Sequence, residues 1–216
     1  MAFDSLPLFL LRYNDQDRNG LQESAMGITT ILQPECGVIL DTCALIYLVK
    51  LDLLVAAADG FQLLAPRVVL DEFRHKSGGK PLSPQVARLL GQGKLEVRPV
   101  VDERPSPLTG GESACLALAR ELAAGSPPRP VVVVTDDGKA CRVLRNRQIP
   151  FLNTPLFICA LMQLGRLSAA EAASAIRLNL MLGRYGRDVV QRIRQQFFEV
   201  SGEVLDGAES PGRSAP

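Results

Sequence analysis

The sequence lacks much of the chemistry on which many enzymes depend. Its single histidine, His75, excludes mechanisms that need a histidine pair and metal sites made of several histidines. Its five cysteines are an odd number without Cys-x-x-Cys spacing, which argues against a disulfide framework or a zinc site and fits a reducing cytosol. No apolar run reaches the roughly 18–20 residues of a membrane span, and the N-terminus has no basic signal-peptide segment. We therefore expect a cytoplasmic protein without membrane contacts.

Several signatures of phosphate-handling proteins are also missing. The chain contains neither the GxxxxGKS/T phosphate loop nor a GxGxxG dinucleotide motif. A phosphatase of the haloacid-dehalogenase type needs an aspartate two residues after Asp41, and Cys43 holds that place. A receiver domain needs an acid pair after the first strand and a lysine after the last one, and the sequence has neither.

Acidic residues are scarce between residues 138 and 194. This stretch holds ten basic residues and only two acids, Glu171 and Asp188, although the whole chain has a net charge of +1. Nine of the ten bases are arginine, the better partner for phosphate oxygens. The asymmetry suggests a polyanionic partner, although a set of solvated helix faces would have the same composition.

The centre of the predicted fold is the four-valine run at 131–134, between Pro130 and Gly138. Such a run is typical of a strand buried on both faces of a parallel sheet. Further strands are expected at 37–40, 61–64, 94–101 and 149–152. Helices are expected at 42–58 (one or two), 67–76, 83–90, 112–124, 139–147, 155–164, 168–182 and 188–200. This alternation predicts an α/β fold with a largely parallel sheet.

The same patterns suggest one main domain with appendages. We expect an N-terminal extension at 1–35, the α/β domain at 36–182, a basic C-terminal helix at 183–203 and a disordered tail at 204–216. The apolar helix at 155–164 could supply a dimer interface or belong to the core.

Carboxylates stand where the predicted strands end. They are Asp41 after the first strand, Asp71 and Glu72 after the second, Glu112 after two glycines, and Asp136 and Asp137 after the valine run. Carboxyl ends of parallel strands share one edge, so we expect these acids to meet in one cleft. Their mutual repulsion would raise their pKa values unless a cation neutralised them. The oxygen-preferring cations Mg²⁺ and Mn²⁺ are the natural occupants.

Each acid also has a simpler explanation. Acids at strand ends could cap the helices that follow, Thr109 to Glu112 fits a capping box, and Asp71 and Glu72 could lie on a solvated helix face. If these explanations held for every acid, several unrelated helix caps would all have to lie at the same edge of the sheet. We therefore favour the shared site.

Four segments, in order, resemble the PIN-domain family of metal-dependent ribonucleases, which includes many bacterial toxins of toxin–antitoxin pairs. They read VILDTCALIYL, PRVVLDEF, LTGGESACLALA and VVVVTDDGKACRVLR, within about residues 37–182. The resemblance implies a three-layer α/β/α fold and is strongest to members with extra C-terminal helices. One departure is Cys43, where the family often has a small polar residue.

The resemblance also implies roles for individual residues. It implies that four acids hold the metal: Asp41, Glu72, Glu112 and Asp137. In the pattern Pro-x-x-Val-x-x-Glu, Glu72 rather than Asp71 takes the place of the glutamate. It also implies that Asp136 assists in catalysis, that Thr42 supports Asp41, and that Thr135 supports the acids.

The resulting hypothesis is a Mg²⁺- or Mn²⁺-dependent endoribonuclease in which a metal-activated water attacks the RNA phosphodiester. Four basic residues on the helix leaving the site are expected to hold the RNA backbone: Lys139, Arg142, Arg145 and Arg147. The resemblance implies an antitoxin protein and a homodimer as further partners. The alternative is a catalytically silent PIN-like module that binds RNA or protein. All four acid positions are filled, which favours the enzyme.

Overall fold

The computed structural model describes residues 32, 36–78, 81–100 and 106–206. Apart from Leu32, the extension expected at 1–35 lies outside the described residues, as do residues 207–216 of the tail expected at 204–216. Residues 204–206 of that tail are ordered, since Leu205 is buried and the Arg177 Nε donates to the Asp206 carbonyl at 2.8 Å.

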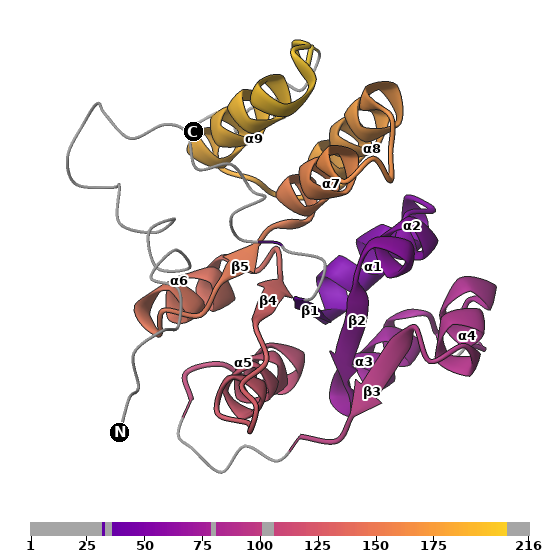
Figure 1. The fold of residues 1–216 in the computed structure, drawn as a ribbon, viewed down its shortest axis with the longest axis vertical. Coiled ribbons are helices and arrows are strands. Elements are labelled where there is room, and N and C mark those ends of the chain that lie inside the picture. The colour runs from indigo at the N-terminus through magenta and orange to yellow at the C-terminus, as the bar shows by residue number, and fades with distance from the viewer. Residues whose placement is uncertain (1–31, 33–35, 79–80, 101–105, 207–216) are drawn as a thin grey trace.

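A five-stranded parallel sheet forms the centre of the protein, in the order β3-β2-β1-β4-β5 (Figure 1). The strands are β1 (Gly37–Leu40), β2 (Gln62–Pro66), β3 (Leu95–Arg98), β4 (Val131–Val134) and β5 (Phe151–Leu152). Every residue of β1 and β4 is buried, as the uninterrupted apolar runs predict. The predicted parallel α/β fold is therefore confirmed.

Helices connect and cover these strands. They are α1 (Thr42–Lys50), α2 (Leu54–Gly60), α3 (Arg67–Lys76), α4 (Pro84–Gly91), α5 (Gly110–Ala123), α6 (Gly138–Asn146), α7 (Thr154–Gln163), α8 (Ala169–Leu182) and α9 (Arg187–Ser201). The apolar stretch at 42–58 forms two helices because Asp52 adopts a left-handed φ of 58° between them. Helix α5 begins two residues earlier than expected, at the glycine pair.

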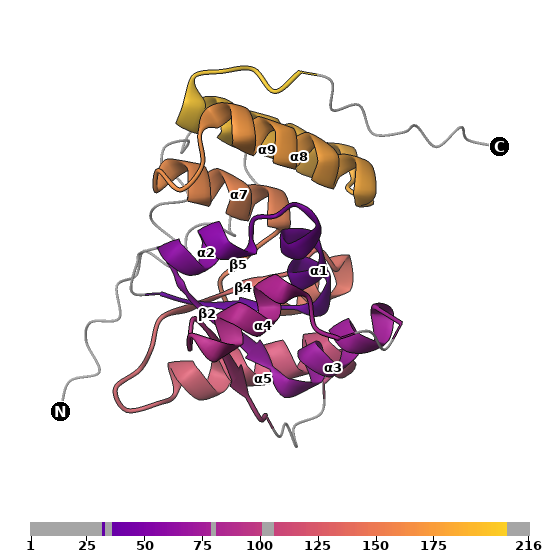
Figure 2. The same ribbon diagram turned by 90° about the vertical axis from the view of Figure 1, so that its right-hand side faces the viewer.

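The helices form layers on both sides of the sheet. Helix α5 packs against β1, β2 and β4 on one face, whereas α7 lies on the other side and contacts α1 and α2 (Figures 1 and 2). Helices α8 and α9 both pack on α7 and form an outer layer (Figure 2).

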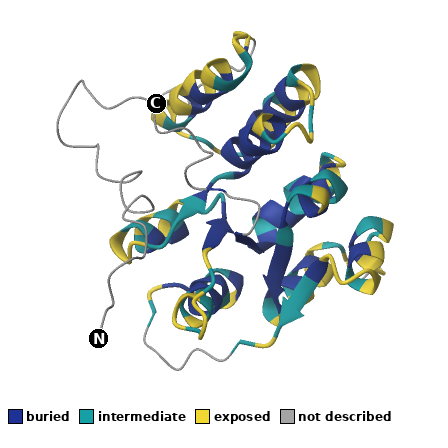
Figure 3. Ribbon diagram, viewed as in Figure 1, coloured by how far each residue is buried: buried dark blue, intermediate teal, exposed yellow. Residues whose placement is uncertain are grey.

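Helix α7 belongs to the core. Residues 154–162 are all buried (Figure 3), since α8 and α9 cover the side of the helix that faces away from the sheet. Of the two possibilities left open for the apolar helix at 155–164, core and dimer interface, the structure shows the core. None of the described helices combines the length and apolar character needed to cross a membrane.

The strand register fixes what stands at the carboxyl edge of the sheet. Leu40 pairs with Val134, and Val134 pairs with Leu152. The residues that follow these three therefore begin side by side. Asp41 extends the β1–β4 ladder by one bond, from its N–H to the Val134 carbonyl at 3.1 Å.

Replacing Phe157 by alanine tests the position of α7. Its side chain is fully buried, with its ring centroid 5.6 Å from that of Phe61. We expect Phe157→Ala to lower the free energy of unfolding by about 3–5 kcal/mol, measured by urea titration. Phe198 on α9 is 52% exposed, so Phe198→Ala should cost less than about 1 kcal/mol. Equal losses would contradict the burial of α7.

Candidate active site

Asp41 lies at the end of β1 with its carboxylate almost completely buried. It is the N-cap of α1: its Oδ1 accepts a hydrogen bond from the Ala44 N–H at 2.7 Å. Its Oδ2 accepts a hydrogen bond from the Thr135 hydroxyl at the end of β4. The second contact follows from the strand register, because the pairing of Leu40 with Val134 places the next two residues opposite each other. Asp41 can therefore cap α1 and also belong to the shared site.

Burial is the main cause of an unusual electrostatic state of Asp41. It raises the pKa of the carboxyl to about 7, and the nearby carboxylates of Asp136 and Glu112 add to the rise. The hydrogen bonds from Ala44 and Thr135 act in the opposite direction. Acids from three segments therefore act on one another at this edge.

Glu72 on α3 is held at the N-terminus of α5. Its Oε2 accepts a hydrogen bond from the Thr42 hydroxyl at 2.5 Å, and its Oε1 accepts one from the Gly111 N–H at 2.8 Å. The N-terminal end of a helix favours a carboxylate. Thr42 therefore supports Glu72 and not Asp41, the acid that it follows in the sequence.

The two glycines before Glu112 make this contact possible. Gly110 has a left-handed φ of 56°, and a Cβ on it would lie 2.5 Å from the Glu72 Oε1. A Cβ on Gly111 would lie 2.9 Å from both the Glu72 Oε2 and the Thr42 Oγ1. The glutamate can reach the helix end only because neither residue has a side chain.

Glu112 and Asp137 stand at the first turns of their helices. Asp137 is the N-cap of α6: its Oδ1 accepts a hydrogen bond from the Ala140 N–H at 2.7 Å, and its own N–H donates to the Thr135 hydroxyl at 3.3 Å. Glu112 is half-buried on α5. The capping box considered for it is absent, since the Thr109 side chain makes no cap bond.

Asp136 joins three elements. Its carboxylate accepts hydrogen bonds from the Thr154 N–H at 2.9 Å, from the Thr154 hydroxyl, and from the Tyr185 hydroxyl at 2.7 Å. It therefore binds the start of α7 and the turn between α8 and α9. Burial raises the pKa of Asp136, although these three donors partly offset the effect. Burial and then the Asp136 charge raise the pKa of Tyr185, so the tyrosine stays protonated and can donate.

Short links connect all the predicted acids except Asp71. Thr135 bridges Asp41 to Asp137, while Thr42 follows Asp41 directly and bonds to Glu72. Glu72 in turn binds the residue before Glu112. Within the described part of the chain, however, no three acidic, cysteine or histidine side chains lie close enough together to form a ready-made cation site.

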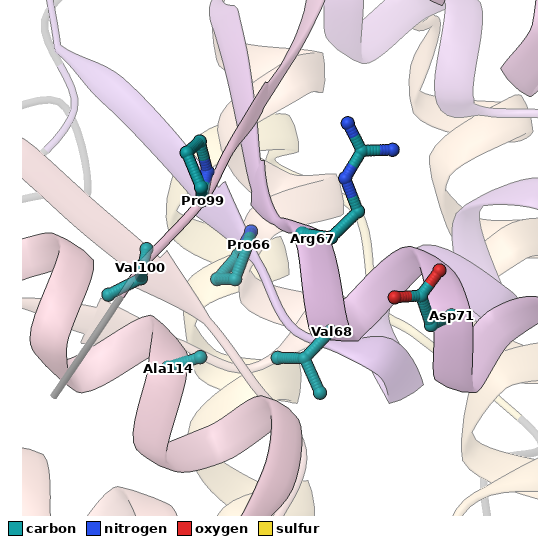
Figure 4. A pocket seen from close by; sticks show the side chains of 7 residues that line it. All are labelled: Pro66, Arg67, Val68, Asp71, Pro99, Val100 and Ala114. Carbon is teal, nitrogen blue, oxygen red and sulfur yellow. The ribbon is translucent and has the colours of Figure 1, made fainter.

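Asp71 lies apart from these links. It is exposed and lines a pocket of about 280 Å³ (Figure 4). The other residues around this pocket are Pro66, Arg67, Val68, Pro99, Val100 and Ala114. The arrangement separates Glu72 from its neighbour in the sequence.

The cysteines near the acids are poor nucleophiles. Burial, followed by the Asp41 charge, raises the pKa of Cys43 to about 11. Burial raises the pKa of Cys141 to about 12, and the Asp136 charge contributes. Both thiols are protonated at neutral pH, which leaves little thiolate to react. His75 is exposed on α3.

The predicted RNA-binding residues lie on or just after α6, which begins next to Asp137. Lys139, Arg142 and Arg147 are exposed, and Arg145 is half-buried. These basic residues thus extend from the N-terminus of α6, next to the acids, to the residue after the end of the helix.

A family model described as a PIN domain matches residues 37–199. The chain belongs to the PIN-domain family. PIN domains generally have a nuclease-type fold, and the match extends through α8 and most of α9. A search of curated proteins finds no match.

Three residues at the PIN-domain site were not predicted from the sequence. They are Thr154 and Tyr185, which bond directly to Asp136, and Asn179, which contacts Tyr185. The Tyr185 hydroxyl lies 2.7 Å from the Asn179 Oδ1. A fully buried asparagine within the apolar face of α8 is the one signal that could have pointed to them.

Replacing Gly110 by alanine tests how tightly Glu72 is seated. We expect a loss of about 3 kcal/mol in unfolding free energy, because a strained backbone adds to broken Glu72 hydrogen bonds. Gly93 is the matched control, since it has a φ of 67° but a Cβ on it would meet nothing within 4 Å. Gly93→Ala should cost only about 1 kcal/mol. Equal losses in urea titrations would show that the contact with Glu72 is not tight.

Replacing Asp41 by asparagine should stabilise the metal-free protein in a pH-dependent way. Because the folded pKa of Asp41 is raised, the folded state holds a proton that the unfolded state releases between about pH 4 and pH 7. Native stability is therefore lost as pH rises through this window. In EDTA, Asp41→Asn should exceed the native protein by about 2 kcal/mol at pH 8 and by little at pH 4. A difference that does not change with pH would contradict the buried charge.

Proposed function

We propose that this PIN-domain protein is a Mg²⁺- or Mn²⁺-dependent endoribonuclease. The observation that carries the proposal is the gathering of acids from four separate segments at one edge of the sheet, joined through Thr42, Thr135 and the glycine pair. Four of these acids would hold the metal: Asp41, Glu72, Glu112 and Asp137.

The donor set fits a hard divalent cation. All four side chains offer carboxylate oxygens, the ligands that Mg²⁺ and Mn²⁺ prefer. Burial, and to a smaller extent the charges of Asp136 and Glu112, raise the pKa of Asp41, and a bound cation would favour its charged form. When bound, such a cation supplies a Lewis acid that polarises a phosphodiester and neutralises the charge developing on its oxygens.

The residues of the chain itself orient this site. Ala44 and Thr135 fix the Asp41 carboxylate from two sides, so its position does not depend on a ligand. The Asp137 carboxylate caps α6 through its Oδ1, and its Oδ2 can therefore face a ligand. The buried strand ends beneath these acids exclude water from one side.

The basic residues of α6 would hold the RNA backbone. Lys139, Arg142 and Arg147 are exposed on or just after a helix that starts at Asp137. Contacts of this kind do not depend on sequence and weaken as salt rises. Arg145 would contribute from a half-buried position.

A catalytically silent binding module is the second candidate. The observation in its favour is that both oxygens of Glu72 already accept hydrogen bonds within the protein. In this alternative the acids hold the fold together, and the basic helices carry the binding function.

An antitoxin and a homodimer are part of the proposal as protein partners. Since α7 is core, a dimer would need another surface. Leu178, Met181 and Leu182 are exposed at neighbouring positions of α8 and offer an apolar surface for either partner.

The decisive experiment is RNA cleavage with Mn²⁺. We expect the native protein to cut single-stranded RNA, EDTA to abolish the cutting, and Asp41→Asn to lower the rate by about 100-fold or more. Asp71→Asn is the matched control: it makes the same chemical change on an exposed acid outside the site, so its rate should stay near the native value.

Equal cleavage by native protein and Asp41→Asn would sink the nuclease proposal. Salt-dependent RNA binding without cleavage would instead favour the binding module. Growth arrest on expression of the native protein, relieved by Asp41→Asn, would support the toxin role.

A further inference from the structure

The turn between α8 and α9, residues 183–186, reaches back to the acids although it follows β4 by about 50 residues in the sequence. Its Tyr185 hydroxyl lies 2.7 Å from the Asp136 Oδ1 and 2.7 Å from the Asn179 Oδ1. A hydroxyl carries one proton and donates to one acceptor at a time. With the Asn179 amide rotated by half a turn, its Nδ2, which has no partner among the described residues, would donate to Tyr185 and leave the hydroxyl proton for Asp136.

The shape of the turn depends on this contact. A Cβ on Gly183 would overlap the Tyr185 ring, so the ring folds against a backbone that only glycine provides. Tyr185 also lies near Cys43 and Tyr47 of α1. Asp41 is the N-cap of α1, so the turn lies close to the helix that follows β1 as well as to Asp136 at the end of β4.

Two arginines flank the anchored tyrosine. Arg184 precedes Tyr185 and Arg187 opens α9, and both are exposed. Neither forms an ion pair with another residue in the described part of the chain. Arg184 is adjacent in the sequence to the residue that contacts Asp136, and Arg187 lies two positions beyond that residue.

We infer that the α8–α9 turn is a second contact for the RNA backbone, in which Arg184 and Arg187 bind phosphates at the rim of the site and Tyr185 positions them through Asp136. The inference rests on the proposed ribonuclease function. It adds a second set of basic contacts to the RNA path, from a turn outside α6 that contacts the acids through Tyr185 and Asp136. Guanidinium groups suit this role because they bind phosphate oxygens in a fork.

The test compares RNA binding by four full-length proteins that all carry Asp41→Asn, so that no cleavage occurs. They are the parent, Arg184→Ala/Arg187→Ala, Tyr185→Phe, and Arg88→Ala/Arg166→Ala. The last removes two exposed arginines near Asp59, at the opposite end of the sheet. The probe is a short fluorescent single-stranded RNA of mixed sequence, titrated at several salt concentrations.

We expect Arg184→Ala/Arg187→Ala to reduce the slope of log affinity against log salt by about 1.4, since each single-strand phosphate contact contributes about 0.7. Its affinity at low salt should fall about tenfold, whereas Arg88→Ala/Arg166→Ala should match the parent. Tyr185→Phe keeps both arginines, so its affinity and its slope should lie between those of the two double-arginine variants. If its thermal stability matches that of the parent, the weaker RNA binding is not caused by a folding defect.

Equal slopes for the two double-arginine variants would overturn the inference. A changed oligomeric state in sedimentation, with unchanged RNA binding, would overturn it too and mark the turn as a protein contact. If the native enzyme cleaves RNA while either of these results is obtained, the proposed nuclease function still holds. Absence of both cleavage and RNA binding would remove the proposed function itself.

Discussion

The pairing of β1 with β4 is the constraint on which the site depends. Leu40 lies opposite Val134, both fully buried, so the next residues of the two strands must meet. One of them is Asp41 and the other is Thr135, and the hydroxyl of the second satisfies the carboxylate of the first. A slip of the register by one residue would leave Asp41 buried without this donor, which is costly. The apolar core and the polar site are therefore specified together.

The acids combine two properties: they accept hydrogen bonds within the protein, and they carry charge that is costly to bury. Both oxygens of Glu72 and both oxygens of Asp41 accept hydrogen bonds within the protein, and Asp136 has three donors, so all three acids join separate elements. Asp41 is buried at an electrostatic cost, and Glu112 adds to its raised pKa. Sites that keep such unfavourable charge trade stability for function. The mixture explains how the same residues can be helix caps and members of a functional cluster.

The sequence predicted the parts that depend on local pattern. Uninterrupted apolar runs identified β1 and β4, and the helix expected at 168–182 is present as α8, which starts with a capping box between Ser168 and Glu171. The strand ends also indicated that Asp41 and Asp137 lie at one edge, where Thr135 bonds to both. The four-acid metal site stays a prediction. The break of the first helical stretch at Asp52 and the earlier start of α5 depend on backbone angles, which composition specifies weakly.

The contacts that the sequence did not reveal are mostly long-range. Tyr185 and Asp136 are 49 positions apart, and no periodic pattern connects a tyrosine in a turn to an acid at a strand end. The partner of Thr42 was mistaken for a similar reason: adjacency to Asp41 suggested one acid, whereas helix packing delivers another 30 positions away. Such pairings depend on how distant segments pack together, and a short stretch of sequence does not specify this packing.

The anchoring of Asp136 has a consequence for where this domain ends. Asp136 is bound by Thr154 at the start of α7 and by Tyr185 beyond α8, while α9 packs against α7. The C-terminal helices are thus structural members of the acidic edge and not an appendage to it. A chain shortened after α8 would lose both the bond from Tyr185 to Asp136 and the packing of α9 on α7, so we expect the acidic edge itself to be less stable in such a chain.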